Sequence, residues 1–303
     1  MPAGKGEDVP RPVLRDLVST TGDLAALPTT VVRLLELLRD QTCAAERLAQ
    51  VLDRDGAMTA NVLKLCNSAF YGLRGTVSTT RQALVMLGNR AVATLAFATG
   101  MVPVMRRHLV GYGMDHERFW EHSLHSAMAA GLAAERLGYG DRACEAFTAG
   151  LVHDVGMLAL DAHLATYGMR VVPTLPLFNV AAREREALGF DHTEAGGLLA
   201  ANWGLPVSLT AAITHHHRPW DASDDPELVA AVLAGDLAAQ MAHDGLQPEA
   251  WPRELAFLTA LGLDAEALAE LARTVATAPD ETLARVTQPA GAPWPAVQPV
   301  AGR

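Results

Sequence analysis

The chain has 303 residues, enough for about two domains, and half of them are hydrophobic, so it can bury a sizeable core. The formal net charge of -10 at pH 7 argues against non-specific binding to nucleic acid or to an anionic membrane surface. A small local basic site for a phosphate ligand remains compatible with that charge.

Cysteine usage and hydropathy favour a soluble, cytoplasmic protein. Cys43, Cys66 and Cys144 are scattered and form no CxxC pair, which is typical of reduced thiols. The first twelve residues are polar and charged, without the apolar stretch of a signal peptide. The longest apolar run, residues 91–105, is shorter than the roughly 20 residues of a membrane span, and we expect a buried helix there.

Helical periodicity begins near residue 31 and predicts an all-α fold, because strand patterns are almost absent. Val31, Leu34 and Leu35 lie on one helix face. Thr79 and Gln82 have the spacing of a capping box, which marks a helix start. In the first half, helices are predicted over residues 31–38, 48–52, 59–68, 79–88 and 91–107.

In the second half, Asp191 and Glu194 again have capping-box spacing, and Gly204 and Pro206 separate that helix from the next. Pro219 cannot continue the helix that precedes it. Helices are predicted over residues 117–137, 144–162, 191–204, 206–217 and 226–242, with one or two more over 252–276.

The sequence Gly111-Tyr112-Gly113 interrupts the helical pattern and marks the predicted boundary between two subdomains. The segment after Thr287 is rich in Pro, Gly and Ala without periodicity, which is typical of disorder. The expected organisation is a disordered tail over 1–12, an N-terminal helical subdomain over 13–112, a second helical subdomain over 113–247, C-terminal helices over 248–286 and a disordered tail over 287–303.

A set of histidine and aspartate residues in the second half offers the ligand types of a borderline transition-metal ion. At its centre is the adjacent pair His153-Asp154. The full candidate set is His122, His153, Asp154, His192, His216, His217 and Asp236.

Several sequence motifs accompany this set. They are Leu27-Pro28, Leu63-Lys-Leu-Cys-Asn-Ser-Ala-Phe-Tyr-Gly72, Val77-Ser78, Phe119-Trp120-Glu-His122, Ala149-Gly-Leu-Val-His-Asp-Val-Gly156, Gly189-Phe-Asp-His192, Asn202-Trp-Gly-Leu-Pro206 and His215-His-His217. In this order the motifs resemble the HDOD family, a branch of the HD superfamily of metal-dependent phosphohydrolases related to HD-GYP proteins. The resemblance covers about residues 14–245.

The resemblance implies a bacterial signalling protein with an N-terminal helical subdomain packed on an HD-type helical bundle. By matching motif positions, it implies a first metal site made by His122, His153, Asp154 and Asp236. It implies a second site made by His192, His216 and His217, with Asp154 as a bridging ligand and catalytic candidate. The expected cofactor is Fe, Mn or Zn, mono- or dinuclear.

Two departures from the HD-GYP pattern argue against hydrolysis of a cyclic dinucleotide. Met157 stands where that branch has a lysine that meets the substrate phosphate, and a thioether carries no charge. Arg218-Pro-Trp-Asp follows His217, and no Gly-Tyr-Pro is present there. Arg218 is the candidate replacement for the missing phosphate-binding cation.

Each candidate residue also has a structural interpretation without a ligand role. His125 lies three residues from His122, so either could be the ligand. His192 could be a solvated helix-start residue, Asp236 could be an exposed charge, and His215–His217 suit a helix C-terminus.

Other polar and aromatic features favour structural roles. The charged run from Arg183 to Glu186 is typical of a solvated helix face. Asn67 is interpreted as a helix C-cap, an alternative to contacts across the subdomain interface. Trp120, Trp203 and Trp220 are expected to pack in the core or at an interface, with stacking on a nucleobase as the alternative.

These observations leave three functions open. The first is a stand-alone regulatory module that binds a signalling partner such as a kinase, a cyclase or a transcription regulator. The second is a metal-dependent phosphohydrolase or phosphodiesterase acting on a nucleotide or cyclic dinucleotide. The third is a sensor that binds a nucleotide or a metal without turnover.

Overall fold

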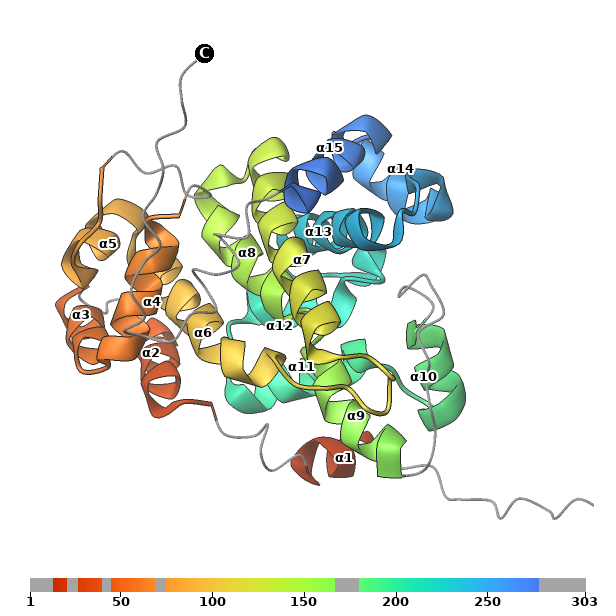
Figure 1. Cartoon of the computed structure of the whole chain (residues 1–303), viewed down its shortest axis with the longest axis horizontal. Helices are drawn as coiled ribbons and strands as arrows, with labels where there is room; N and C mark the ends of the chain where they lie inside the picture. The colour runs from red at the N-terminus through yellow and green to blue at the C-terminus, as the bar shows by residue number, and fades with distance from the viewer. Residues whose placement is uncertain (1–12, 21–26, 40–44, 69–74, 167–179, 278–303) are drawn as a thin grey trace, which may run out of the picture.

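The computed structural model describes residues 13–20, 27–39, 45–68, 75–166 and 180–277, and within them it is all-α without a strand, as predicted (Figure 1). The only β-type pairing there is an isolated bridge between Leu109 and Met114. The predicted disordered tails lie outside the described residues. The α-helices are α1 Leu14–Thr20, α2 Thr29–Arg39, α3 Ala45–Asp53, α4 Gly56–Cys66, α5 Thr80–Leu87, α6 Asn89–Met105, α7 His116–Arg136, α8 Ala143–Val152, α9 Val155–Thr166, α10 Val180–Leu188, α11 His192–Trp203, α12 Val207–His215, α13 Pro226–Asp244, α14 Pro252–Ala260 and α15 Ala265–Ala276.

The helices α2 to α5 gather on one side of α6, as Figure 1 shows. The predicted apolar face of α2 is buried, with Val31 and Leu34 almost completely inaccessible. Gly100 of α6 lets α2 approach closely, because a Cβ there would lie 2.5 Å from Cγ2 of Val31. Asn67 is the C-cap of α4, although its φ of -86° is not left-handed, and its side chain binds the backbone of Val77.

The second half is built on α7, α8 and α13, which pack along one another, with α15 against α7 and α13. Gly235 permits this close contact, since a Cβ at that position of α13 would lie 2.4 Å from the carbonyl oxygen of Ser126 in α7. The helices α9, α11 and α12 form a neighbouring group. Helix α1 packs against α9 and α11, far from the other N-terminal helices (Figure 1).

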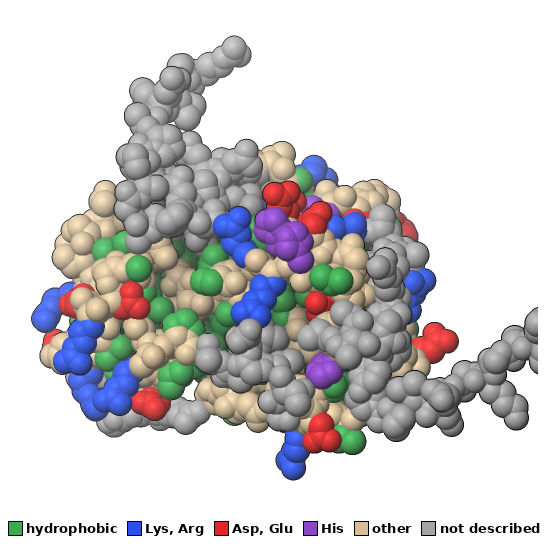
Figure 2. Space-filling view, turned by 60° about the horizontal axis from the view of Figure 1, so that its bottom comes forward, with side chains coloured by type: hydrophobic (Ala, Val, Ile, Leu, Met, Phe, Trp, Pro, Cys, Tyr) green, Lys and Arg blue, Asp and Glu red, His purple; other side chains and the backbone are tan. Residues whose placement is uncertain are grey.

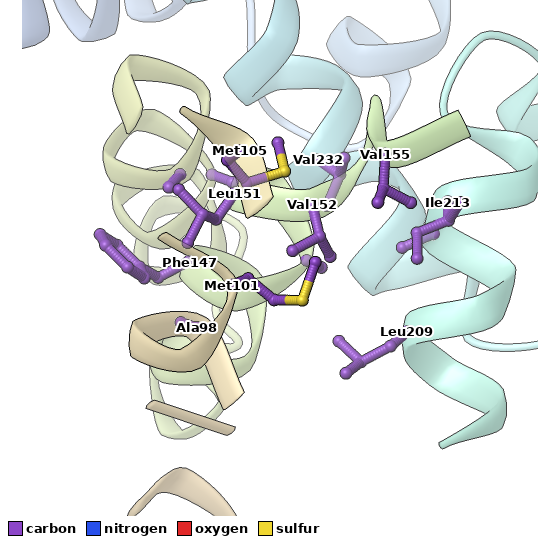
Figure 3. Packing of buried hydrophobic residues seen from close by; sticks show 14 of the residues in the cluster. Ala98, Met101, Met105, Phe147, Leu151, Val152, Val155, Leu209, Ile213 and Val232 are labelled. Carbon is purple, nitrogen blue, oxygen red and sulfur yellow. The ribbon is translucent and has the colours of Figure 1, made fainter. Parts of the chain in front are cut away.

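Helix α6 connects the two groups because it is apolar on all sides. Figure 3 shows Ala98, Met101 and Met105 of α6 beside Phe147 and Leu151 of α8 in the buried cluster. The opposite side of α6 contacts α2, α4 and α5. Burial of both sides explains why the sequence from residue 91 to 105 is almost entirely apolar, as expected for a buried helix.

A buried carboxylate fastens α6 to α8 and α12. Glu145 accepts hydrogen bonds from Arg90 at 2.5 Å, from Ser208 at 2.6 Å and from Nε of Arg142 at 3.0 Å. Arg142 also pairs with Asp225 at the start of α13. On the face shown in Figure 2, acidic and basic side chains are interspersed, in agreement with the modest net charge.

Two features of the fold differ from the predicted elements. The single helix predicted over residues 144–162 is interrupted at His153 and Asp154, which form a turn between α8 and α9. Helix α1 was not predicted, and of α10 only the run from Arg183 to Glu186 was interpreted as helical. Among the described residues, Gly140–Asp161 matches a membrane span in length and composition, but its apolar window is completely buried inside the protein.

Candidate metal centre

The candidate ligands come together from five places in the second half. His122 lies in the first third of α7, His153 and Asp154 lie between α8 and α9, and Asp236 lies in the middle of α13. His192 is the first residue of α11, whose N-cap Asp191 makes the predicted capping box with Glu194. His216 and His217 follow the last residue of α12. All are buried except His217, whose side chain keeps 11% of its surface exposed.

Asp154 is the centre of the arrangement. Its Oδ1 lies 3.3 Å from Nε2 of His192 and 3.5 Å from Nε2 of His216. Its Oδ2 lies 3.2 Å from Nε2 of His153 and 3.6 Å from Nε2 of His122. Two ligands that each lie about 2.1 Å from one ion are about 3.0–3.4 Å apart, so this spacing suits ligands that share an ion.

Asp236 completes the side of the cluster that contains His122. Its Oδ1 lies 3.3 Å from Nε2 of His122 and 3.8 Å from Nε2 of His153. Gln240, one turn further along α13, donates a hydrogen bond of 2.8 Å to the same oxygen. The other carboxylate oxygen of Asp236, Oδ2, lies 3.8 Å from Nδ1 of His217.

The donor atoms form two groups that share one residue. One potential ligand atom from each of His122, His153 and Asp154 lies within 4.8 Å of the others. The same holds for Asp154 with His192, His216 and His217. This arrangement is compatible with two neighbouring ions bridged by the Asp154 carboxylate.

The histidines are oriented by hydrogen bonds on the far side of each ring. Nδ1 of His153 donates to the carbonyl oxygen of Gly150 at 2.7 Å, and Nδ1 of His216 donates to that of Ile213 at 2.9 Å. In the neutral form of either ring, the proton on Nδ1 leaves Nε2 with a lone pair that faces Asp154. Such a bond at the outer nitrogen is typical of metal-binding histidines.

Several buried polar atoms of this cluster have no hydrogen-bond partner. They are both ring nitrogens of His122, Nε2 of His153 and His216, Oδ1 of Asp154 and Oδ2 of Asp236. Leaving one such buried atom unsatisfied costs about 1–3 kcal/mol. Several unpartnered atoms that converge around Asp154 are the pattern expected of a metal site. Imidazole nitrogens and carboxylate oxygens are donor types that fit a divalent transition metal.

The electrostatics of the cluster favour ionised carboxylates. Burial alone would raise the pKa of Asp154, but positive charge on His153 and the nearby His122 ring hold this pKa well below its usual range. Burial alone would lower the pKa of His122, yet the nearby carboxylates of Asp154 and Asp236 raise it to about 9. The pKa of His192 is raised to about 10, because Glu184 outweighs the effect of burial.

His216 and His217 differ from His122 and His192, because their environment favours the neutral ring. Burial, reinforced by the charge of His153, lowers the pKa of His216. Burial together with the charges of His216 and His192 lowers that of His217 well below its usual value. Since a metal binds the neutral imidazole, the second donor group already includes two rings in the required form.

The structure decides between the alternatives left open for individual residues. His125 is turned to His243, with Nδ1 and Nε2 2.8 Å apart and the rings stacked, so His122 is the residue of α7 that joins the cluster. His192 and Asp236 are about 1% exposed, so neither is solvated.

Arg218 and Met157 lie next to the cluster along the chain. Arg218 is half-buried, and its guanidinium makes no hydrogen bond or ion pair with the part of the chain that the structure describes. Met157 is 3% exposed and belongs to the hydrophobic core. Trp220 packs against Arg253 and Phe257, which supports the packing interpretation of this side chain.

Glu184, Tyr112 and Gln240 adjoin the cluster, although the sequence pattern placed none of them there. The interpretation of residues 183–186 as a solvated face is wrong for Glu184, which is completely buried and accepts hydrogen bonds from Tyr112 and His192. Gln240 had a detectable signal, since a lone amide four residues after Asp236 interrupts an apolar helix. Tyr112 and Glu184 had none, because their partners are distant in the sequence.

Comparison with known proteins identifies the relatives of this chain. The HDOD domain family matches residues 24–219. The chain superposes on a predicted phosphohydrolase from Shewanella amazonensis SB2B with a TM-score of 0.65 and 25% identity, over 91% of this chain and 98% of that one. An HDOD domain protein with unknown function from Geobacter sulfurreducens matches with a TM-score of 0.65 and 24% identity, over 89% and 96% of the two chains.

Among curated sequences, an uncharacterized protein from Treponema pallidum (strain Nichols) is 23% identical over 241 residues, 77% of this chain and 45% of that protein. The chain spans less than half the length of the curated relatives that it matches.

Proposed function

Because the chain belongs to the HDOD domain family, we propose that it is a signal-transduction protein that binds a protein partner and keeps a metal-binding HD-type centre. The observation that carries the metal-binding part is the convergence of buried ring nitrogens and carboxylate oxygens that have no hydrogen-bond partner. An apolar core tolerates such atoms only where another ligand satisfies them.

The proposed ligands are divided between two positions that share Asp154. His122, His153 and Asp236 would hold one ion, and His192, His216 and His217 would hold the other. A set dominated by imidazole favours Fe, Mn or Zn over Mg²⁺, which prefers oxygen ligands. A metal bound there would lower the pKa of a coordinated water and would offset the charge of a phosphate group.

The residues around the proposed ligands favour regulation over hydrolysis. Met157 is apolar and buried in the core, so it cannot neutralise a substrate phosphate. Arg218 is the cation that we propose for a phosphate contact, since it is half-buried beside His217 and has no ion-pair partner among the described residues. A phosphohydrolase is the second candidate function, and the two donor groups bridged by one carboxylate favour it.

Metal analysis tests the centre directly. The protein would be produced without an affinity tag in iron- and manganese-replete medium and analysed by inductively coupled plasma mass spectrometry. We expect at least one equivalent of Fe, Mn or Zn in the wild type and a loss of most of it in Asp154→Asn. His125→Ala is the matched control, because His125 binds His243 outside the cluster. A wild type without metal would refute the proposed centre.

The choice between regulation and hydrolysis needs two assays on one preparation. Partners recovered from native lysate would be purified, and their binding to this protein would be measured with purified components. Turnover of cyclic dinucleotides, nucleotides and an aryl phosphodiester would be measured with the metal-loaded protein. Turnover that disappears in Asp154→Asn, together with failure to bind any purified partner, would overturn the regulatory proposal in favour of the phosphohydrolase.

A further inference from the structure

The segment between α6 and α7, residues 106–115, is a compact turn. Leu109 and Met114 exchange backbone hydrogen bonds of 2.9 Å and 3.0 Å, and Gly113 has a positive φ of 61°. Tyr112 at its tip is completely buried, whereas Val110 is 63% exposed. The turn therefore has one solvent side and one side inserted into the protein.

On the side inserted into the protein, two carboxylates accept hydrogen bonds from this turn. Oδ1 of Asp161 accepts a hydrogen bond of 2.7 Å from the backbone nitrogen of Gly111. Oε1 of Glu184 accepts one of 2.5 Å from the hydroxyl of Tyr112. Asp161 belongs to α9 and Glu184 to α10, so the turn is attached to two helices distant in the sequence.

The second oxygen of Glu184 binds a proposed metal ligand. Oε2 accepts hydrogen bonds from the backbone nitrogen of His192 at 2.8 Å and from its Nδ1 at 2.7 Å. With Nδ1 held in this way, Nε2 of His192 faces Oδ1 of Asp154 at 3.3 Å and Nε2 of His217 at 3.1 Å. A continuous chain of hydrogen bonds thus runs from Tyr112 through Glu184 to the proposed centre.

The chemistry of this chain favours a functional coupling. A buried carboxylate is costly, and the three donors around Glu184 satisfy it through charge-assisted hydrogen bonds. A carboxylate behind a histidine fixes its tautomer and raises its basicity toward a metal. A cation at Nε2 makes the Nδ1 proton more acidic and strengthens its bond to Glu184, and this change also alters the bond between Glu184 and Tyr112.

We infer that Glu184 is a positioning residue for His192 and that Tyr112 couples this pair to the turn at residues 106–115, so that metal occupancy alters the stability of the turn. This inference rests on the proposed metal centre. Since α6 precedes the turn and α7, which carries His122, follows it, the turn is the covalent connection between the N-terminal helices and the centre. By reciprocity, a partner that displaced Tyr112 would weaken metal binding by the same factor.

Cobalt binding and hydrogen exchange test this coupling without an activity assay. Co²⁺ affinity would be measured from visible absorption for the wild type, Glu184→Gln and Tyr112→Phe, with Asp161→Ala as the matched control. Loss of the carboxylate should weaken binding about 10–100-fold, with a smaller loss for Tyr112→Phe. Asp161→Ala removes only the hydrogen bond to the backbone of Gly111 and leaves Tyr112 bound to Glu184, so its affinity should match the wild type.

Hydrogen exchange of the turn gives the second readout. In the wild type, Co²⁺ should slow amide exchange at residues 109–113, and Tyr112→Phe should abolish this dependence on metal. Circular dichroism identifies a variant that fails to fold. If Glu184→Gln does not fold, Tyr112→Phe by itself still tests the coupling. The coupling would be overturned, but not the proposed centre, if Glu184→Gln and Tyr112→Phe both bound Co²⁺ as tightly as the wild type. The same holds if Co²⁺ did not change amide exchange of the turn in the wild type. A wild type that binds no Co²⁺ would overturn the proposed centre as well.

Discussion

The close contact between α9 and α11 makes Gly156 a position where one methyl group should damage both the fold and the centre. A Cβ there would lie 1.9 Å from the carbonyl oxygen of His192 and 2.6 Å from the backbone nitrogen of Gly196. Real Cβ atoms essentially never come within 3.0 Å of another atom, so the helices must separate by about 1.1 Å, the difference between 3.0 Å and 1.9 Å.

This separation fixes the expected magnitude of the Gly156→Ala effect. Both opposing atoms belong to the backbone and cannot rotate away, so the loss should reach the upper end of the overpacking range, about 3 kcal/mol. For a chain of this size, that corresponds to a fall in Tm of about 5 °C. His192 would also move away from Asp154, where the present separation is 3.3 Å, and metal affinity should fall about 10–100-fold.

Differential scanning calorimetry of the metal-free protein and Co²⁺ titration measure the two effects. Gly56→Ala is the matched control, because a Cβ at Gly56 meets nothing within 4 Å and its φ is not positive. That variant should stay within about 1 kcal/mol of the wild type and keep its affinity for Co²⁺. A Tm and an affinity for Gly156→Ala equal to those of Gly56→Ala would refute the argument from close packing.

Three further predictions concern charge. Asp154→Asn should weaken Co²⁺ binding more than about 100-fold in equilibrium dialysis, since it removes a carboxylate shared by both donor groups, and a loss below tenfold would contradict the bridging role. In the metal-free protein the pKa values of His122 and His192 are raised to about 9 and 10, so a metal must displace two protons below pH 9. The apparent Kd for the metal should therefore fall as pH rises from 6 to 8, by up to about 100-fold per pH unit. Calorimetry in buffers of different ionisation enthalpy should measure how many protons the protein releases when the metal binds. Metal binding without proton release would contradict the assigned charges. Glu145→Ala should lower the free energy of unfolding by about 2 kcal/mol in a urea titration, because the guanidinium groups of Arg90 and Arg142 lose their buried partner; an unchanged midpoint would contradict this.

The helical fold was predictable because its signals are local. The apolar face of α2, the capping box at Asp191 and the left-handed Gly204 each depend on residues within one or two turns. The family resemblance is confirmed by the match over residues 24–219. The structure brings the predicted histidines and aspartates together, and their role as metal ligands remains a proposal.

What could not be predicted depends on contacts between distant segments. Residues 144–162 contain no Pro, and Gly150 and Gly156 each lie three residues from His153, so neither marks a helix end at His153, yet the helix is interrupted there. Adjacent residues of a continuous helix point about 100° apart, and the interruption lies where both His153 and Asp154 face one centre. Glu184 was misjudged because its neighbours Arg183 and Glu186 are exposed, and only its partners Tyr112 and His192 account for its burial.

The burial of α6 on every side has a consequence for how the molecule folds. Its methionine face, Met101 and Met105, belongs to the core of the second half, while its opposite face covers α2, α4 and α5. Neither half can exclude water from this helix alone, so loss of one half would expose an apolar helix of 17 residues. The two halves should therefore unfold together in a single cooperative transition, and a fragment that ends after α6 should aggregate rather than fold.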